Sequence, residues 1–174
     1  MDYFVLKQDE RYANTPALLE VRQKIDSRKI NRFHAGTLPD TIVFHVQADT
    51  DSAYLDLLDR QLFLVSDKLK KVIGMYAPDT LFKMIPLIDP QNRRQQIYYL
   101  PILEEIEALS DSNVFNLYRS VIKKLVLQEE KVKGKKLFAV KEGEQTMVIV
   151  RLDVAESILR RRLKGIKLVR AAME

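Results

Sequence analysis

Short apolar runs recur along the chain, and most of them predict β-strands. Each run is rich in β-branched and aromatic residues, and turn-forming or polar residues flank it. The runs that predict strands cover residues 3–6, 41–46, 62–65, 80–88, 96–103, 121–127, 136–140, 145–151 and 166–169. The sequence therefore predicts a protein built mainly from strands.

Prolines and glycines limit how these strands can pair. Pro86 and Pro101 cannot donate a backbone hydrogen bond, so the two strands that contain them are predicted to be edge strands or to end near these prolines. The three strands within 121–151 are joined by short segments that contain Gly134 and Gly143. Such short connections favour an antiparallel meander, because a parallel crossover needs a dozen or more residues.

A helical period of 3.6 residues begins after Ser66, whose side chain is suited to cap the first backbone amides. Gly74 and Pro78 are predicted to end this helix. Its apolar face contains Leu69, Val72, Ile73 and Tyr76. A further short helix is predicted over 17–25, because Pro16 suits the first position of a helix.

Another helix is predicted near the end of the sequence, from Asp153 to Leu163. Asp153 with Glu156 three residues later resembles a capping box, and Gly165 follows the predicted end, where a left-handed residue is favoured. The predicted apolar face contains Val154, Ala155, Ile158 and Leu159.

Three consecutive arginines near the end of this helix point in three directions. Arg160 lies opposite the apolar face, Arg161 lies near its edge, and Arg162 lies within it. Because an unpaired buried charge is costly, Arg162 is predicted to turn inward to a carboxylate or carbonyl partner. If Arg162 is exposed and unpaired, either the predicted register of the helix or its predicted end at Leu163 is wrong.

The order of elements predicts an α+β fold. Strands occur in runs with two or three helices among them, which favours a largely antiparallel sheet with the helices packed on it. A chain of 174 residues is long enough for one hydrophobic core, so a single domain over 1–174 is expected.

Positive charge is concentrated at the C-terminal end. Residues 1–118 contain 14 Lys and Arg against 17 Asp and Glu (14 − 17 = −3), whereas 119–174 contain 15 against 7 (15 − 7 = +8). This asymmetry permits an acidic protein or a nucleic acid as partner. Nucleic acid is the less favoured, because only Phe138 remains after Tyr118 as an aromatic residue for base stacking.

Catalytic and metal-binding patterns are scarce. The absence of cysteine excludes disulfides and thiolate chemistry. Asp49 and Asp51 could begin a calcium loop, but Ala53 and Tyr54 occupy positions that need a ligand and a glycine. His34 and His45 have no metal-ligand spacing, and no glycine-rich phosphate loop occurs. We therefore expect no enzyme activity, cofactor or metal.

The cellular location is predicted to be the cytoplasm. The first apolar run, 3–6, is too short for a signal-peptide core. No window approaches the ~20 apolar residues that a membrane helix requires.

Several segments together resemble a known bacterial family. They are Phe63–Ser66 with the helix that follows, Tyr98–Leu103, Ser120–Leu127, Ile149–Asp153, Ala155–Arg161 and Gly165–Ile166. Over about 40–170 the chain resembles a family first catalogued as a domain of unknown function and later assigned as immunity family eleven of polymorphic-toxin systems. The resemblance implies a non-enzymatic protein that binds and neutralises a cognate toxin. A nucleic-acid-binding domain using the basic C-terminal third is the alternative.

Two sets of residues are candidates for contact with a partner. Interfaces favour exposed tyrosine and arginine, so the first set is Tyr118, Arg119, Arg160 and Arg161. The alternative surface is the compact acidic group that includes Glu104 and Glu105.

Overall fold

The computed structural model describes residues 1–115, 122–143 and 145–174. The strands are β1 (Tyr3–Gln8), β2 (Ala17–Leu18), β3 (Phe44–Gln47), β4 (Leu57–Leu58), β5 (Leu64–Val65), β6 (Leu81–Asp89), β7 (Arg94–Ile102), β8 (Val114–Phe115), β9 (Ile122–Lys124), β10 (Val126–Leu127), β11 (Leu137–Glu142), β12 (Gln145–Arg151), β13 (Ile166–Arg170) and β14 (Ala172–Met173). The α-helices are α1 (Val21–Lys24), α2 (Asp67–Tyr76), α3 (Glu129–Val132) and α4 (Leu152–Arg160).

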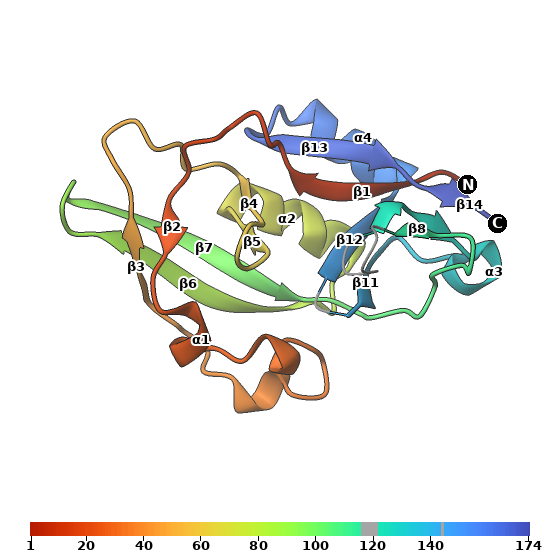
Figure 1. Cartoon of the computed structure of the whole chain (residues 1–174), viewed down its shortest axis with the longest axis horizontal. Coiled ribbons are helices and arrows are strands. Elements are labelled where there is room, and N and C mark those ends of the chain that lie inside the picture. Colours follow the sequence, from red (N-terminus) through yellow and green to blue (C-terminus); the bar gives the residue numbers. More distant parts are fainter. Residues whose placement is uncertain (116–121, 144) are drawn as a thin grey trace.

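Two larger sheets organise the chain (Figure 1). One is four-stranded, with the order β11-β12-β1-β13, and all of its pairs are antiparallel. The other is six-stranded, with the order β2-β3-β6-β7-β5-β4, and contains one parallel pair, β3 with β6. The long β6–β7 hairpin extends to the left in Figure 1, while β1 and β13 lie side by side at the top.

Helices α2 and α4 bring the two sheets together. α2 packs on β5 and β7, α4 packs on β1 and β12, and the two helices contact each other. Their apolar faces share a core with Leu6, Val148 and Val150 of the four-stranded sheet. The predicted α+β fold with largely antiparallel pairing and packed helices is therefore confirmed.

The start and the apolar face of α2 are as predicted. Ser66 Oγ accepts a hydrogen bond from Leu69 N–H at 3.2 Å, and Leu69, Val72 and Ile73 are fully buried. Gly74 does not end the helix, which continues to Tyr76. The helix stops just before Pro78, because a residue that precedes proline is disfavoured in helical conformation.

The helix predicted over 17–25 is mostly wrong. β2 occupies its first residues and pairs with β3, and α1 is a single turn. Glu20 adopts a left-handed conformation (φ 58°), which interrupts any helix at this point. Leu18 N–H is held by Gln61 Oε1 at 2.7 Å, so a tertiary contact decides the local conformation.

Pro86 lies inside the six-stranded sheet and not at its edge. β6 pairs with both β3 and β7, and it continues beyond Pro86 to Asp89. Met84 N–H, on the β3 side, donates to Asp40 O at 2.8 Å, and Pro86 faces the same side two residues later. Pairing with β3 resumes at Leu87, so the missing N–H falls in a gap of the ladder. The edge prediction is wrong for Pro86, whereas β7 does end next to Pro101.

The strand predicted over 121–127 does not join the meander. β11 and β12 form the predicted hairpin, but β9 pairs with β8, and β10 pairs in parallel with β14. The Asn113 side chain accepts a hydrogen bond from Val126 N–H at 2.8 Å and donates one to Val126 O at 2.9 Å. These contacts hold β10 beside the C-terminal strand, and α3 separates it from β11. Residue 121 lies outside the described residues.

The N-cap of α4 lies two residues before the predicted one. Arg151 occupies the N-cap position, and Asp153 lies in the first turn. Arg151 donates two hydrogen bonds to the Asp153 carboxylate, at 2.9 and 2.8 Å, and this contact lowers the pKa of Asp153. The predicted cap is wrong, because Arg151 occupies the N-cap position and the Asp153 carboxylate bonds mainly to the Arg151 side chain. Its charge still suits the positive end of the helix.

Candidate partner-binding surface

β13 is one outer strand of the four-stranded sheet. It pairs antiparallel with β1 along its whole length, and none of its five residues is fully buried. Backbone hydrogen bonds of 2.9 Å flank this pairing, from Ala171 N–H to Tyr3 O and from Asp9 N–H to Gly165 O. They fix which residues of β13 direct backbone groups at β1.

The outer side of β13 carries unpaired backbone groups. Hydrogen-bonded pairs alternate along an antiparallel ladder, so Lys167 and Val169 direct their N–H and C=O groups at β1. Ile166 and Leu168 consequently direct theirs away from the sheet. Within the described ranges no backbone hydrogen bond reaches these outward groups. Such an edge is a template for another strand.

A hollow of about 550 Å³ lies between β13 and α4. Figure 1 shows α4 behind β13 at the top of the molecule. Most of the lining is apolar and consists of Phe4, Leu152, Ala155, Leu159, Ile166 and Leu168. Leu159 is 65% exposed, so its predicted place in the buried face of the helix is wrong. The hollow therefore places exposed apolar surface beside unpaired backbone groups.

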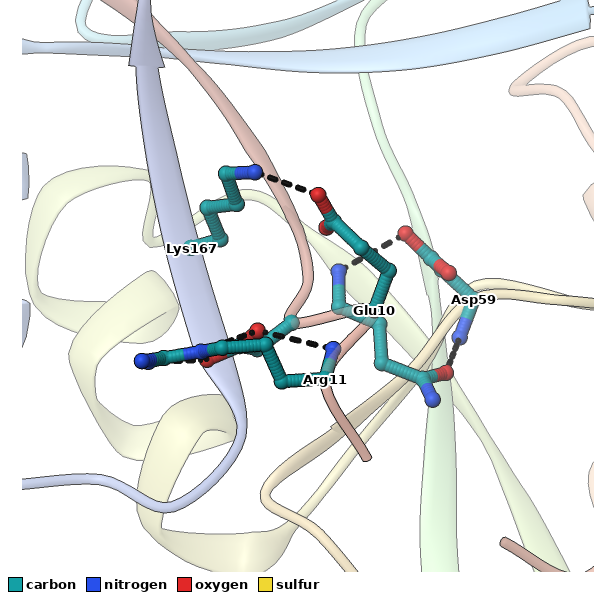
Figure 2. A network of polar contacts seen from close by, with 6 residues as sticks. Glu10, Arg11, Asp59 and Lys167 are labelled. Carbon is teal, nitrogen blue, oxygen red and sulfur yellow. Dashed lines mark hydrogen bonds and ion pairs between the residues drawn. The ribbon is translucent and has the colours of Figure 1, made fainter. Parts of the chain in front are cut away.

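Charged pairs form the rim of this hollow where β1 ends. Figure 2 shows the Glu10 carboxylate directed at the Lys167 ammonium of β13. Arg11 Nε and Nη2 donate to one carboxylate oxygen of Asp9 at 3.0 and 2.7 Å, which lowers the pKa of Asp9 to about 2. The hydrogen bond from Lys167 also lowers the pKa of Glu10. The Glu10–Lys167 pair connects the segment after β1 to β13, and the lowered pKa values keep both carboxylates ionised near neutral pH.

The three arginines at the end of α4 have different environments from those predicted. α4 ends at Arg160, before Leu163, and Arg162 follows in left-handed conformation (φ 52°). Arg162 is exposed and, in the described part of the chain, forms no ion pair. The prediction of an inward Arg162 is wrong, because the left-handed residue that terminates the helix turns it away from the apolar stripe.

Arg161, although exposed, makes the carbonyl contact that was predicted for Arg162. Its Nη1 donates to Ser157 O at 2.8 Å and also contacts Ser157 Oγ. Arg160 is exposed, as predicted, and pairs with Glu156 at 3.6 Å. Arg160 pairs with Glu156, which lines the hollow, whereas Arg161 Nη2 lies 3.8 Å from Met75 Sδ of α2. Of the two, Arg160 therefore adjoins the hollow and Arg161 faces α2.

Glu104 and Glu105 lie at the opposite edge of the same sheet. Glu104 pairs with Lys135 at 2.7 Å and Glu105 with Lys141 at 2.8 Å. The structure therefore separates them from Arg160 and Arg161. Tyr118 and Arg119 fall outside the described residues, and their role as partner contacts stays a prediction.

A wider groove of about 800 Å³ is lined in part by β1, β7, β12 and the loop after β4. Gln8 N–H donates to Asp59 Oδ2 at 2.8 Å, and Asp59 N–H donates to Gln8 Oε1 at 3.1 Å (Figure 2). Charged groups of both signs, such as Lys7 and Arg60 with Glu10, are distributed around it. This distribution offers no concentrated charge for a phosphate or a metal ion.

Elements of catalytic sites are few in the described residues. No group of three or more His, Asp or Glu side chains there is arranged to hold a metal ion. His34 packs edge to face on Phe33 with ring centroids 4.8 Å apart, and His45 lies on β3 with its side chain exposed. No helix in the described ranges is long and apolar enough to span a membrane.

The sequence did not reveal the open edge of β13 beside the hollow. It predicted the strand at 166–169 but had no means of placing it at an edge, because edge position depends on strand order. A comparison with curated proteins gives no match. A family model for an immunity protein family matches residues 5–173, nearly the whole chain. The chain thus belongs to the Imm11 immunity protein family.

Proposed function

We propose that this protein neutralises one cognate bacterial toxin by binding it in the cytoplasm, without catalysis. The main support for this proposal is the family match over residues 5–173, since immunity proteins generally act by binding. The open edge of β13 beside an apolar hollow supports a protein as the ligand. Stoichiometric binding would block the active site or substrate site of the toxin.

Co-expression tests this function directly. The toxin domain encoded beside this gene is produced with and without the chain in a sensitive host. We expect restored growth and an equimolar complex on size-exclusion chromatography with light scattering. If neither a complex nor protection is found with any genomically adjacent toxin, the proposal is wrong.

A titration separates binding from catalysis. Inhibition of the purified toxin should be complete at one equivalent and should reverse when the complex is dissociated under denaturing conditions and the toxin refolds. An inhibition that is complete at one-hundredth of an equivalent, or a changed toxin mass, would instead indicate enzymatic inactivation.

The nucleic-acid alternative gains no support from the arrangement of the cations. Many cations of the C-terminal third already face carboxylates, in the pairs Lys135–Glu104, Lys141–Glu105, Arg151–Asp153, Arg160–Glu156, Lys167–Glu10 and Arg170–Asp2. We expect no DNA or RNA binding at about 50 mM salt. A steep decrease of affinity with salt would restore this alternative.

A further inference from the structure

We propose that the toxin presents an extended segment that pairs with the open edge of β13 and places alternate apolar side chains in the hollow beside α4. This inference rests on the proposed function, because it takes the toxin as the partner. It adds the binding surface, the conformation of the bound segment and its chemical character.

The backbone of β13 offers unpaired hydrogen-bonding groups to an added strand. Ile166 and Leu168 each direct one N–H and one C=O outward, spaced two residues apart as in any strand. An added strand satisfies these groups without any change in the β1–β13 pairing. Strand addition of this kind derives affinity from main-chain hydrogen bonds.

The hollow offers an apolar surface to the side chains of the same added strand. The side chains of Ile166 and Leu168 lie on the face of the sheet that packs against the core of α2 and α4. In an added strand, every second side chain faces that same side and meets Leu159 and Leu152 of α4. A strand edge beside a helix thus offers hydrogen bonds and an apolar pocket to one extended segment, which is the arrangement that gives strand addition its specificity.

The charges near the hollow identify the character of the segment. The loop from α4 to β13 leads directly into Ile166, which lines the hollow, and carries Arg162 and Lys164. In the described part of the chain, no carboxylate lies within ion-pair distance of either side chain. The bound segment is therefore expected to carry acidic residues at the end that meets this loop.

A second copy of this chain fits the edge poorly. β13 has the sequence Ile-Lys-Leu-Val-Arg, with two cations and no acid. Pairing of two such edges would offer Arg162 and Lys164 of the preceding loop no acidic partner, because the facing strand contains none. Charged residues on an edge strand are also a common defence against self-association. The edge accordingly favours an acidic strand from another protein.

The test uses a matched pair of substitutions at one position. Leu168→Pro removes an outward N–H and places a ring where the new strand would lie, and the preceding extended residue tolerates proline. Leu168→Ala removes the same apolar side chain but retains the N–H. We expect Leu168→Pro to bind the toxin domain about tenfold or more weaker than Leu168→Ala in calorimetry. Equal affinities of the two variants would overturn strand addition.

Two further variants test the hollow. Leu159→Glu places a charge on its exposed wall, and Leu81→Glu is the control, at a residue 55% exposed on β6 outside the hollow. We expect about a tenfold or larger loss of toxin affinity for Leu159→Glu and less than about threefold for the control. The opposite order would overturn the proposed location.

Residue-resolved amide exchange remains decisive if a variant folds poorly. In the unmodified chain, amides of Ile166 and Leu168 should exchange fast and those of Lys167 and Val169 slowly. Toxin binding should protect the first pair. A bound and neutralised toxin that leaves Ile166 and Leu168 unprotected would overturn the inference alone, whereas absence of any toxin binding would overturn the proposed function and the inference with it. A dimer of this chain that is lost in Leu168→Pro would also overturn it.

Discussion

The four-stranded sheet has two outer strands, β11 and β13, with opposite surroundings. On β11, Leu137, Phe138, Ala139 and Val140 are all buried, and the segment after β7 covers the outer backbone. Ala139 N–H donates to Glu104 O at 2.8 Å and Ile106 N–H donates to Ala139 O at 2.9 Å. On β13 the outward groups of Ile166 and Leu168 have no such cover among the described residues.

The ion pairs near the two strands reinforce this difference. Glu104 and Glu105 pair with Lys135 and Lys141, so the charges fasten the covering segment to β11 and its flank. At the other edge, Lys167 and Arg170 pair with residues that flank β1, which secures β13 to its inner neighbour. Ion pairs therefore hold a covering segment over the outer backbone of β11. At β13 they connect the strand only to the residues that flank β1, and its outer backbone stays open. Among the described residues, the two edges therefore differ in whether a neighbouring segment bonds to the outer backbone.

The largest predicted effect comes from truncation of a side chain on the covered strand. Phe138 is fully buried and packs edge to face on Tyr3 with centroids 5.8 Å apart, so Phe138→Ala should lower the free energy of unfolding by about 3–5 kcal/mol. Val169 on β13 is 40% exposed, and Val169→Ala should cost less than about 1 kcal/mol. Urea unfolding of both variants measures the contrast. Similar losses would show that β13 is as well packed as β11.

Proline scanning of the two outer backbones gives the next largest effect. Ala139→Pro removes the N–H that bonds to Glu104 O and should destabilise the protein by about 3 kcal/mol. Leu168→Pro should destabilise it by no more than about 1 kcal/mol beyond Leu168→Ala, because its N–H is free. The midpoints of thermal unfolding report both changes. A larger effect at Leu168 would mean that its outward amide has a partner.

Removal of the acidic residues at the covered edge should have a smaller effect. Glu104→Gln combined with Glu105→Gln removes two partly exposed ion pairs, so a loss of about 0.5–1 kcal/mol is expected. Hydrogen exchange at the Ala139 amide should accelerate, while exchange at Leu168 should not change. Toxin affinity should also stay the same, since these residues lie on the other edge. A large loss of affinity would identify the acidic group as the contact surface.

The smallest effect concerns Asp9, which follows β1 and pairs with Arg11 two residues later. The pKa of Asp9 falls from 3.8 to about 2 on folding, through its hydrogen bonds with Arg11. The unfolded state thus binds a proton at higher pH, and the stability that Asp9 contributes is complete above about pH 5 and is lost as the pH falls through 4 toward 2. Urea unfolding from pH 7 to 3 should show this decrease, and Asp9→Asn should reduce it. A decrease in the free energy of unfolding that begins above pH 6 would have to come from the titration of a group other than Asp9.

Local signals predicted elements whose contacts lie close together in the sequence. Ser66 and the spacing of Leu69, Val72 and Ile73 specified α2, because capping and periodicity act within one or two turns. The strands of the β6–β7 and β11–β12 hairpins followed from apolar runs joined by short turns. These features require no knowledge of the rest of the chain.

Predictions failed where a distant contact decided the outcome. Ala17–Leu18 became a strand because β3 and Gln61 hold it. The segment at 125–127 pairs with the C-terminal strand, with Asn113 as its anchor. Arg162 is exposed because α4 ended early and the chain had to reverse into β13. In each case the competing conformations differ little in local energy, so the tertiary contact determined the result.

The sequence by itself determined the secondary elements with strong local patterns, the α+β class, the uneven charge and the resemblance to an immunity family. Only the tertiary structure decided that β11 is covered, that β13 is open, and that Leu159 and Leu168 line one hollow. The physical reason is that a strand's own residues fix its extended shape and its two faces. The order of strands in a sheet, and hence which backbone groups remain unpaired, depends on the packing of segments far apart in the chain.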